Sequence, residues 1–159
     1  PRSPRRPSRR RRAPTRRASH QPTTAPEALA QTHAAAFTDQ RPWSADEFAS
    51  LLPQTGVILC GDAKSFILGR VIVDEAEVLT LATHPDHQRK GLAQAALAQF
   101  LTLARSQGAV RVFLEVAELN IPAKALYLNN NFEIIGNRPR YYVTKDGGKI
   151  GADIMQINL

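Results

Sequence analysis

The stretch that most constrains the fold runs from residue 76 to residue 108. An apolar strand (76–83) is followed by a short basic turn and then by a long amphipathic helix. A helix start presents unpaired backbone N–H groups and the positive end of the helix dipole, which together favour an anion. Gly91 has no Cβ, so a phosphate can approach the main chain, and Arg89 and Lys90 add positive charge beside it. The segment therefore predicts a binding site for a pyrophosphate.

Further elements are predicted on both sides of this segment from apolar periodicity and turn residues. Thr24 and Ser44 each precede a glutamate by three residues, which predicts two capping boxes. The expected helices cover residues 24–37, 44–52, 92–107 and 120–130, and the expected strands cover residues 57–60, 66–73, 76–83, 110–116, 132–142 and 150–159. Strands that alternate with helices in the middle of the chain predict a mixed sheet with helices on both faces.

The positive charge of the chain is concentrated at its N-terminal end. The net charge is +7, but residues 1–20 hold nine arginines and no acid, whereas residues 21–159 hold 12 basic and 14 acidic side chains. Because an Arg/Pro/Ser-rich segment has little to bury, we expect a disordered tail over residues 1–22 and a single domain over 23–159. Composition leaves three interpretations of the tail open: RNA or ribosome binding, a targeting segment, or a non-native extension.

Several classes of protein are disfavoured. A single cysteine, Cys60, excludes an intrachain disulfide and fits a reducing compartment, so a cytoplasmic protein is expected. No run approaches the ~18 apolar residues that a membrane span needs. The histidines lack metal-ligand spacing, and we expect no metal.

Glu115 is the most unusual residue of the strands, since it stands inside the apolar run Val-Arg-Val-Phe-Leu-Glu-Val. One interpretation is ordinary alternation, in which Arg111, Phe113 and Glu115 share a face that is partly open to solvent. The other is a general base in a cleft, because an unpaired buried carboxylate is too costly to be incidental.

Tyr127 lies seven residues after Asn120, so both side chains can project from one face of a helix. It is either a core tyrosine or a phenol placed to protonate a leaving thiolate. A phenol of pKa about 10 can give a proton to a thiolate of pKa about 8.5 at modest cost.

Taken together, these motifs resemble those of the GNAT superfamily of N-acetyltransferases, and within it the bacterial ribosomal-protein-alanine N-acetyltransferases. The spacing Gln/Arg-x-x-Gly-x-Gly/Ala in residues 88–93 is similar to the acetyl-CoA signature of the superfamily. The segments that resemble the narrower family are His33-Ala34-Ala35-Ala36-Phe37, Arg41-Pro42-Trp43-Ser44, Phe113-Leu114-Glu115-Val116, Asn120-x-x-Ala123-x-x-Leu126-Tyr127-x-x-x-x-Phe132 and Arg140-Tyr141-Tyr142. The resemblance covers about residues 27–159.

The resemblance implies a fold and a set of roles. The fold would be the α/β (α+β) GNAT fold, a mixed, mostly antiparallel sheet splayed at the cofactor site. Glu115 would accept a proton and Tyr127 would donate one. Acetyl-CoA, as co-substrate, would contact Leu81, Ala82, Thr83, Arg89, Lys90, Gly91, Leu92, Ala93, Gln94 and Asn120, and the acceptor peptide would contact Trp43, Tyr141 and Tyr142.

The chain also departs from the family pattern at several positions. Asn131 replaces a glycine, and asparagine tolerates the left-handed conformation that a helix end needs. Asp153 interrupts the last strand, where an apolar residue is more typical. The usual first strand of the family is not visible in residues 16–21.

These observations predict a monomeric acetyltransferase acting on the N-terminal α-amine of a protein, most simply the N-terminal alanine of a ribosomal protein. One alternative is a GNAT enzyme acting on a small-molecule amine or a lysine side chain. A second is a non-catalytic RNA- or ribosome-binding protein that uses the basic tail; for the enzyme, we expect nucleic-acid contact by the tail to be incidental.

Overall fold

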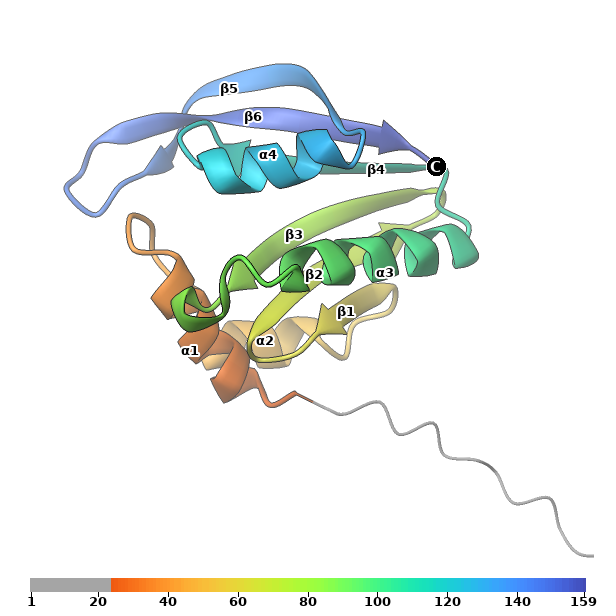
Figure 1. The fold of residues 1–159 in the computed structure, drawn as a ribbon, viewed down its shortest axis with the longest axis horizontal. Coiled ribbons are helices and arrows are strands. Elements are labelled where there is room, and N and C mark those ends of the chain that lie inside the picture. Colours follow the sequence, from red (N-terminus) through yellow and green to blue (C-terminus); the bar gives the residue numbers. More distant parts are fainter. Residues whose placement is uncertain (1–23) are drawn as a thin grey trace, which may run out of the picture.

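The computed structural model describes residues 24–159, so the predictions for the tail and for residues 16–21 lie outside the described part. One six-stranded sheet with the order β1-β2-β3-β4-β6-β5 runs through the molecule (Figure 1). Among the strands of residues 24–159, only the β3–β4 pair is parallel. The strands are β1 (Val57–Gly61), β2 (Ser65–Ile72), β3 (Glu75–Thr83), β4 (Arg111–Ala117), β5 (Glu133–Val143) and β6 (Lys149–Asn158). The predicted mixed, mostly antiparallel sheet is confirmed.

Helices cover both faces of the sheet, as predicted. They are α1 (Pro26–Ala36), α2 (Ala45–Leu51), α3 (Leu92–Ser106) and α4 (Ile121–Asn129), with a short 3-10 turn, η1 (Pro85–His87). Neighbouring residues of β2 show the two layers. Ile67 packs with α3 in one buried cluster, whereas Phe66 and Leu68 pack with α1 and α2 in another.

The sheet splays between β3 and β4. The two strands pair only from Glu75 opposite Arg111 to Val78 opposite Leu114, although β3 continues to Thr83 and β4 to Ala117. Figure 1 shows them diverging beyond this point. On the β2 side the register jumps from Val78 to Thr80, so Leu79 is an extra, bulged residue at the place where the splay begins.

Most of the predicted helix ends are confirmed, and one is wrong. Ser44 forms the expected capping box with Glu47, and Asn131 takes the left-handed conformation with a φ of 68°. Thr24, by contrast, does not cap α1: the N-cap is Ala25, which makes no side-chain cap bond. Pro26 at the first helical position supplies the start by itself, because its fixed φ suits the first turn and its missing N–H needs no partner there.

The unusual Asp153 of β6 is explained by an ion pair with α4. Its Oδ2 lies 2.7 Å from Lys124 Nζ, and its Oδ1 accepts a hydrogen bond of 3.0 Å from Asn137 Nδ2. Lys124, and secondarily Asn137, hold the pKa of this carboxyl below its usual range. The pair ties α4 to the sheet.

Candidate active site

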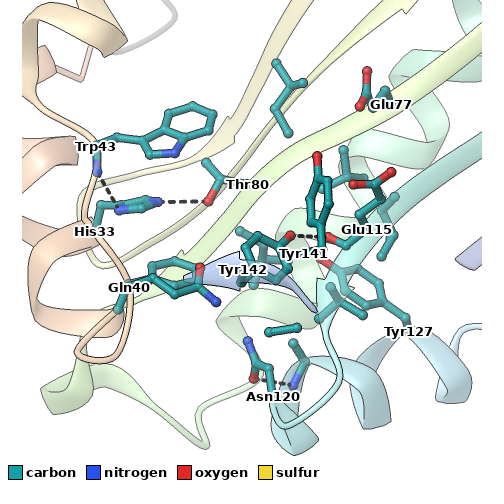
Figure 2. Close-up of a pocket in the computed structure, with 18 of the residues that line it drawn as sticks. His33, Gln40, Trp43, Glu77, Thr80, Glu115, Asn120, Tyr127, Tyr141 and Tyr142 are labelled. Atoms are coloured by element: carbon teal, nitrogen blue, oxygen red, sulfur yellow. Dashed lines mark hydrogen bonds between the residues drawn. The ribbon is translucent and has the colours of Figure 1, made fainter. Parts of the chain in front are cut away.

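A cleft occupies the splay between β3 and β4. Its walls come from both layers: residues of α1 and the α1–α2 loop on one side, and residues of α4 on the other (Figure 2). The structure brings together in it these sequence-predicted residues: Trp43, Leu81, Glu115, Asn120, Tyr127, Tyr141 and Tyr142. Ala82, Thr83 and residues 89–94 are not among the residues that line it.

Glu115 projects into the cleft from β4 and is partly open to solvent. Its Oε1 lies 2.8 Å from Nε of Arg138 on β5, and its side chain is 21% exposed. Glu115 alternates with buried neighbours, as the first interpretation expects, and it lies in a cleft, as the second expects. Its role as a general base stays a prediction. A carboxylate held by one oxygen keeps the other able to accept a proton.

Tyr127 lies against the same cleft from α4 and is almost fully buried, at 4% exposure. Its ring packs against Phe132 with a centroid distance of 5.3 Å. Burial, and to a smaller extent the neighbouring Tyr142, raises the pKa of Tyr127 above its usual value. The phenol therefore carries its proton throughout the neutral pH range, where it can act as an acid but not as a base.

The two adjacent tyrosines of β5 contact Glu115 in different ways. Tyr142 Oη donates a hydrogen bond of 3.4 Å to the main-chain oxygen of Glu115. Burial raises the pKa of Tyr142 to about 12, with the Glu115 charge adding to the effect. The charge of Glu115 is the main cause that raises the pKa of the exposed Tyr141 above its usual value.

His33 forms the opposite wall, and sequence reasoning gave it no role. Its Nδ1 accepts from the main-chain N–H of Trp43 at 3.1 Å, and its Nε2 lies 3.0 Å from Thr80 Oγ1. Because a main-chain N–H can only donate, the ring proton is on Nε2 and the imidazole is neutral. Burial lowers the pKa of His33 to about 4. The ring also stacks on Phe37, with centroids 4.3 Å apart.

The predicted phosphate site lies at the start of α3, beyond the end of β3. Gly91 is the N-cap with a φ of 75°, and a Cβ placed on it would meet no protein atom within 4 Å. Packing therefore does not demand a glycine here, and the open space suits a phosphate approaching the exposed N–H groups. The Gln94 amide is engaged with Asn130 at the end of α4, through two hydrogen bonds of 2.7 and 2.8 Å.

Asn120 caps α4 as well as lining the cleft. Its Oδ1 accepts from the main-chain N–H of Ala123 at 3.3 Å, which confirms the predicted helix start. This geometry leaves the amide nitrogen of Asn120 as the group that can donate to a ligand.

Residues 24–159 contain no group of three or more potential metal ligands. No helix there is long and apolar enough to cross a bilayer.

Comparison with known sequences finds relatives along most of the chain. The model of the acetyltransferase (GNAT) family matches residues 23–132. The ribosomal protein bS18-alanine N-acetyltransferase of Escherichia coli K12 is 34% identical over 110 residues, covering 67% of this chain and 74% of the relative. The N-alpha-acetyltransferase RimI of Mycobacterium tuberculosis is 34% identical over 122 residues, covering 71% and 75%.

Comparison with solved structures gives a similar result. The crystal structure of the ribosomal-protein-S18-alanine N-acetyltransferase from Escherichia coli superposes with a TM-score of 0.75 at 30% identity. The match covers 84% of this chain and 86% of that one.

Proposed function

The chain belongs to the acetyltransferase (GNAT) family, and we propose that it transfers the acetyl group of acetyl-CoA to the N-terminal α-amine of a protein. The relatives named above suggest the N-terminal alanine of a ribosomal protein as the acceptor. The observation that carries the proposal is the convergence of Glu115 and Tyr127 from β4 and α4 on one cleft, at the unpaired edge of β3.

Acetyl-CoA would bind along this edge and reach the start of α3. The main chain of Leu81, Ala82 and Thr83, which has no partner strand on the β4 side, would pair with the pantetheine arm like an added strand. The N–H groups of residues 89–94 would hold the pyrophosphate, and Asn120 would donate to the cofactor. The side chain of Gln94 would have to leave Asn130 if it contacts a phosphate.

Transfer would proceed by direct attack in a ternary complex. Glu115 takes a proton from the acceptor ammonium, directly or through water, and the amine nitrogen then forms a bond to the thioester carbon. Main-chain N–H groups of residues 81–83 would stabilise the developing oxyanion. The carbon–sulfur bond breaks, and the departing thiolate takes the proton of Tyr127. The second proton that leaves the new amide nitrogen would restore the phenol of Tyr127 through water. Burial of the thiolate in the same cleft raises its pKa too, which offsets the weaker acidity of the phenol.

The site suits an α-amine better than a lysine side chain. An α-amine has a pKa of about 7.7–8.0 and a lysine about 10.4, a difference of roughly 3.5 kcal/mol in the cost of deprotonation. The smaller cost favours an α-amine at a site whose one carboxylate base is already engaged by Arg138. Trp43, Tyr141 and Tyr142 would contact the acceptor peptide beside its N-terminus.

The test is acetylation of a panel of N-terminal peptides, a lysine peptide with a blocked N-terminus, and polyamines. We expect the peptides with free N-termini to be acetylated, and the turnover of Glu115→Gln to fall by about 10²–10³ with little change in coenzyme A affinity. Glu133→Gln, on an exposed position of β5, is the matched control and should keep full turnover. Acetylation confined to lysine or polyamines would contradict the proposal and favour the other class of acceptor.

A further inference from the structure

An irregularity in β5 directs several side chains at Glu115. Arg138 pairs with Ala152 and Tyr142 with Ile150, so three residues of β5 stand opposite one residue of β6. Arg140, inside this bulge, has a φ of 55°. The backbone therefore departs from regular strand geometry between Arg138 and Tyr142, and both of these residues contact Glu115.

Arg138 is held over the carboxylate from two sides. Its Nε lies 2.8 Å from Glu115 Oε1, and its guanidinium carbon lies 5.3 Å from the centroid of the Tyr141 ring. A planar guanidinium that stacks on an aromatic face and donates to a carboxylate is fixed in orientation as well as in charge.

The charges around Glu115 come from several elements. Arg138, Tyr141 and Tyr142 face it from β5 and Tyr127 lies near it from α4, while Glu77 stands on β3. Glu77 is compensated by Arg70 of β2 at 3.4 Å. Arg138 is thus the cation that balances the charge of Glu115 itself.

This balance bears on the protonation state of the acceptor. A carboxylate without its own cation would hold an incoming ammonium as an ion pair and raise the pKa of that ammonium. The acceptor would then bind tightly in the form that cannot attack a thioester. A guanidinium already paired with Glu115 weakens the ion pair between the carboxylate and the acceptor ammonium. The second carboxylate oxygen can still accept the proton of that ammonium.

We infer that Arg138 is a positioning residue of the transfer reaction: it holds and neutralises Glu115, so that the carboxylate takes the proton of the acceptor ammonium instead of retaining the acceptor as an ion pair. The inference rests on the proposed function. It predicts opposite effects on binding and turnover, which general damage to the fold does not produce.

The test compares Arg138→Gln with wild type in peptide acetylation between pH 6.5 and 9.5. At pH 7 we expect kcat and the peptide KM both to fall about tenfold, with kcat/KM changed much less, and the acidic limb of the kcat profile to move up by about one pH unit. At pH 9.5 the variant should approach the kcat of wild type. Arg138→Lys, which keeps the charge, should restore most of the kcat at pH 7.

Arg140→Gln is the matched control, because it removes the same charge from the same bulge. No ion pair of Arg140 is found within residues 24–159, and its profile should follow wild type. Thermal unfolding is measured for each variant, and Arg138→Met, which keeps the stem over Tyr141, replaces the glutamine variant if that one unfolds.

A kcat lowered equally at all pH values, a raised peptide KM, or the same behaviour in Arg140→Gln would overturn the inference. Each of these leaves the proposed function standing if Glu115→Gln is inactive. Failure of wild type to acetylate any N-terminal peptide would instead remove the proposed function.

Discussion

Gly91 and Gly108 form a natural pair for testing the phosphate site. Both have a positive φ, of 75° and 93°, and a Cβ at either meets nothing within 4 Å. They flank the two ends of α3, so alanine should cost each about 1 kcal/mol of stability through backbone strain. Gly91→Ala should in addition raise the KM for acetyl-CoA about tenfold, because the methyl group occupies the space that a phosphate would enter.

Steady-state kinetics with varied acetyl-CoA, together with thermal unfolding, checks this expectation. Gly108→Ala should lower the melting temperature similarly and leave the KM unchanged. Equal KM values for acetyl-CoA in the two variants would mean that the phosphates do not bind beside Gly91.

Single residues were predictable from sequence where a motif marks them and not where only the fold does. Glu115 is conspicuous as a charge in an apolar run, and Tyr127 follows Asn120 at helical spacing. Arg138 looks like one more surface arginine, and only a bulge places it on Glu115. His33 had a weak signal: it is a histidine within an otherwise small, apolar helix segment, close to the tryptophan of the following loop.

At the scale of elements, α4 is fastened to β6 by the Lys124–Asp153 pair. The two side chains are only 20% and 12% exposed, so removing one partner leaves the other poorly solvated. Asp153→Asn should lower the free energy of unfolding by about 1–2 kcal/mol, as measured by denaturant titration. The double variant Lys124→Met, Asp153→Leu should recover most of the loss, because neither charge then remains buried.

The double variant also separates stability from catalysis. Since Asn120 caps α4 and Tyr127 lies on it, activity should follow the position of the helix and return with stability. A double variant as unstable as the single one would mean that the pair is not what holds α4.

The local sequence pattern was sufficient to predict which helices and strands exist. The register and the bulges of the sheet depend on pairing between distant strands and could not be predicted. The helix from Leu92 and the hairpin after Tyr142 follow from apolar periodicity and turn residues. Thr24 fits the sequence pattern of a capping box, but α1 begins at Pro26 without a side-chain cap. The extra residue at Leu79 leaves no trace in sequence, because a bulge depends on the register of a neighbouring strand.

At the scale of the whole molecule, two separate cores lie on opposite faces of the sheet, and one of them contains a buried histidine at its border. His33 has a pKa of about 4 when folded and about 6.5 when unfolded. Below pH 6.5 the unfolded chain therefore binds a proton that the folded protein does not. The free energy of unfolding should fall by up to about 1.4 kcal/mol per pH unit between pH 6.5 and 4 through this residue.

Denaturant titrations from pH 7 to pH 4.5 measure this slope. His33→Asn, whose amide oxygen can still accept from the Trp43 N–H, should lose the contribution, whereas His87→Gln should keep it. An unchanged slope in His33→Asn would assign the acid sensitivity to other groups.

The splay has one more consequence. Its lining residues come from elements that cover opposite faces of the sheet, so each face contributes one wall of the cleft. If acetyl-CoA and the acceptor approach from these two faces, neither molecule has to cross the binding path of the other. Such an enzyme has no structural need for a fixed order of substrate arrival or product departure.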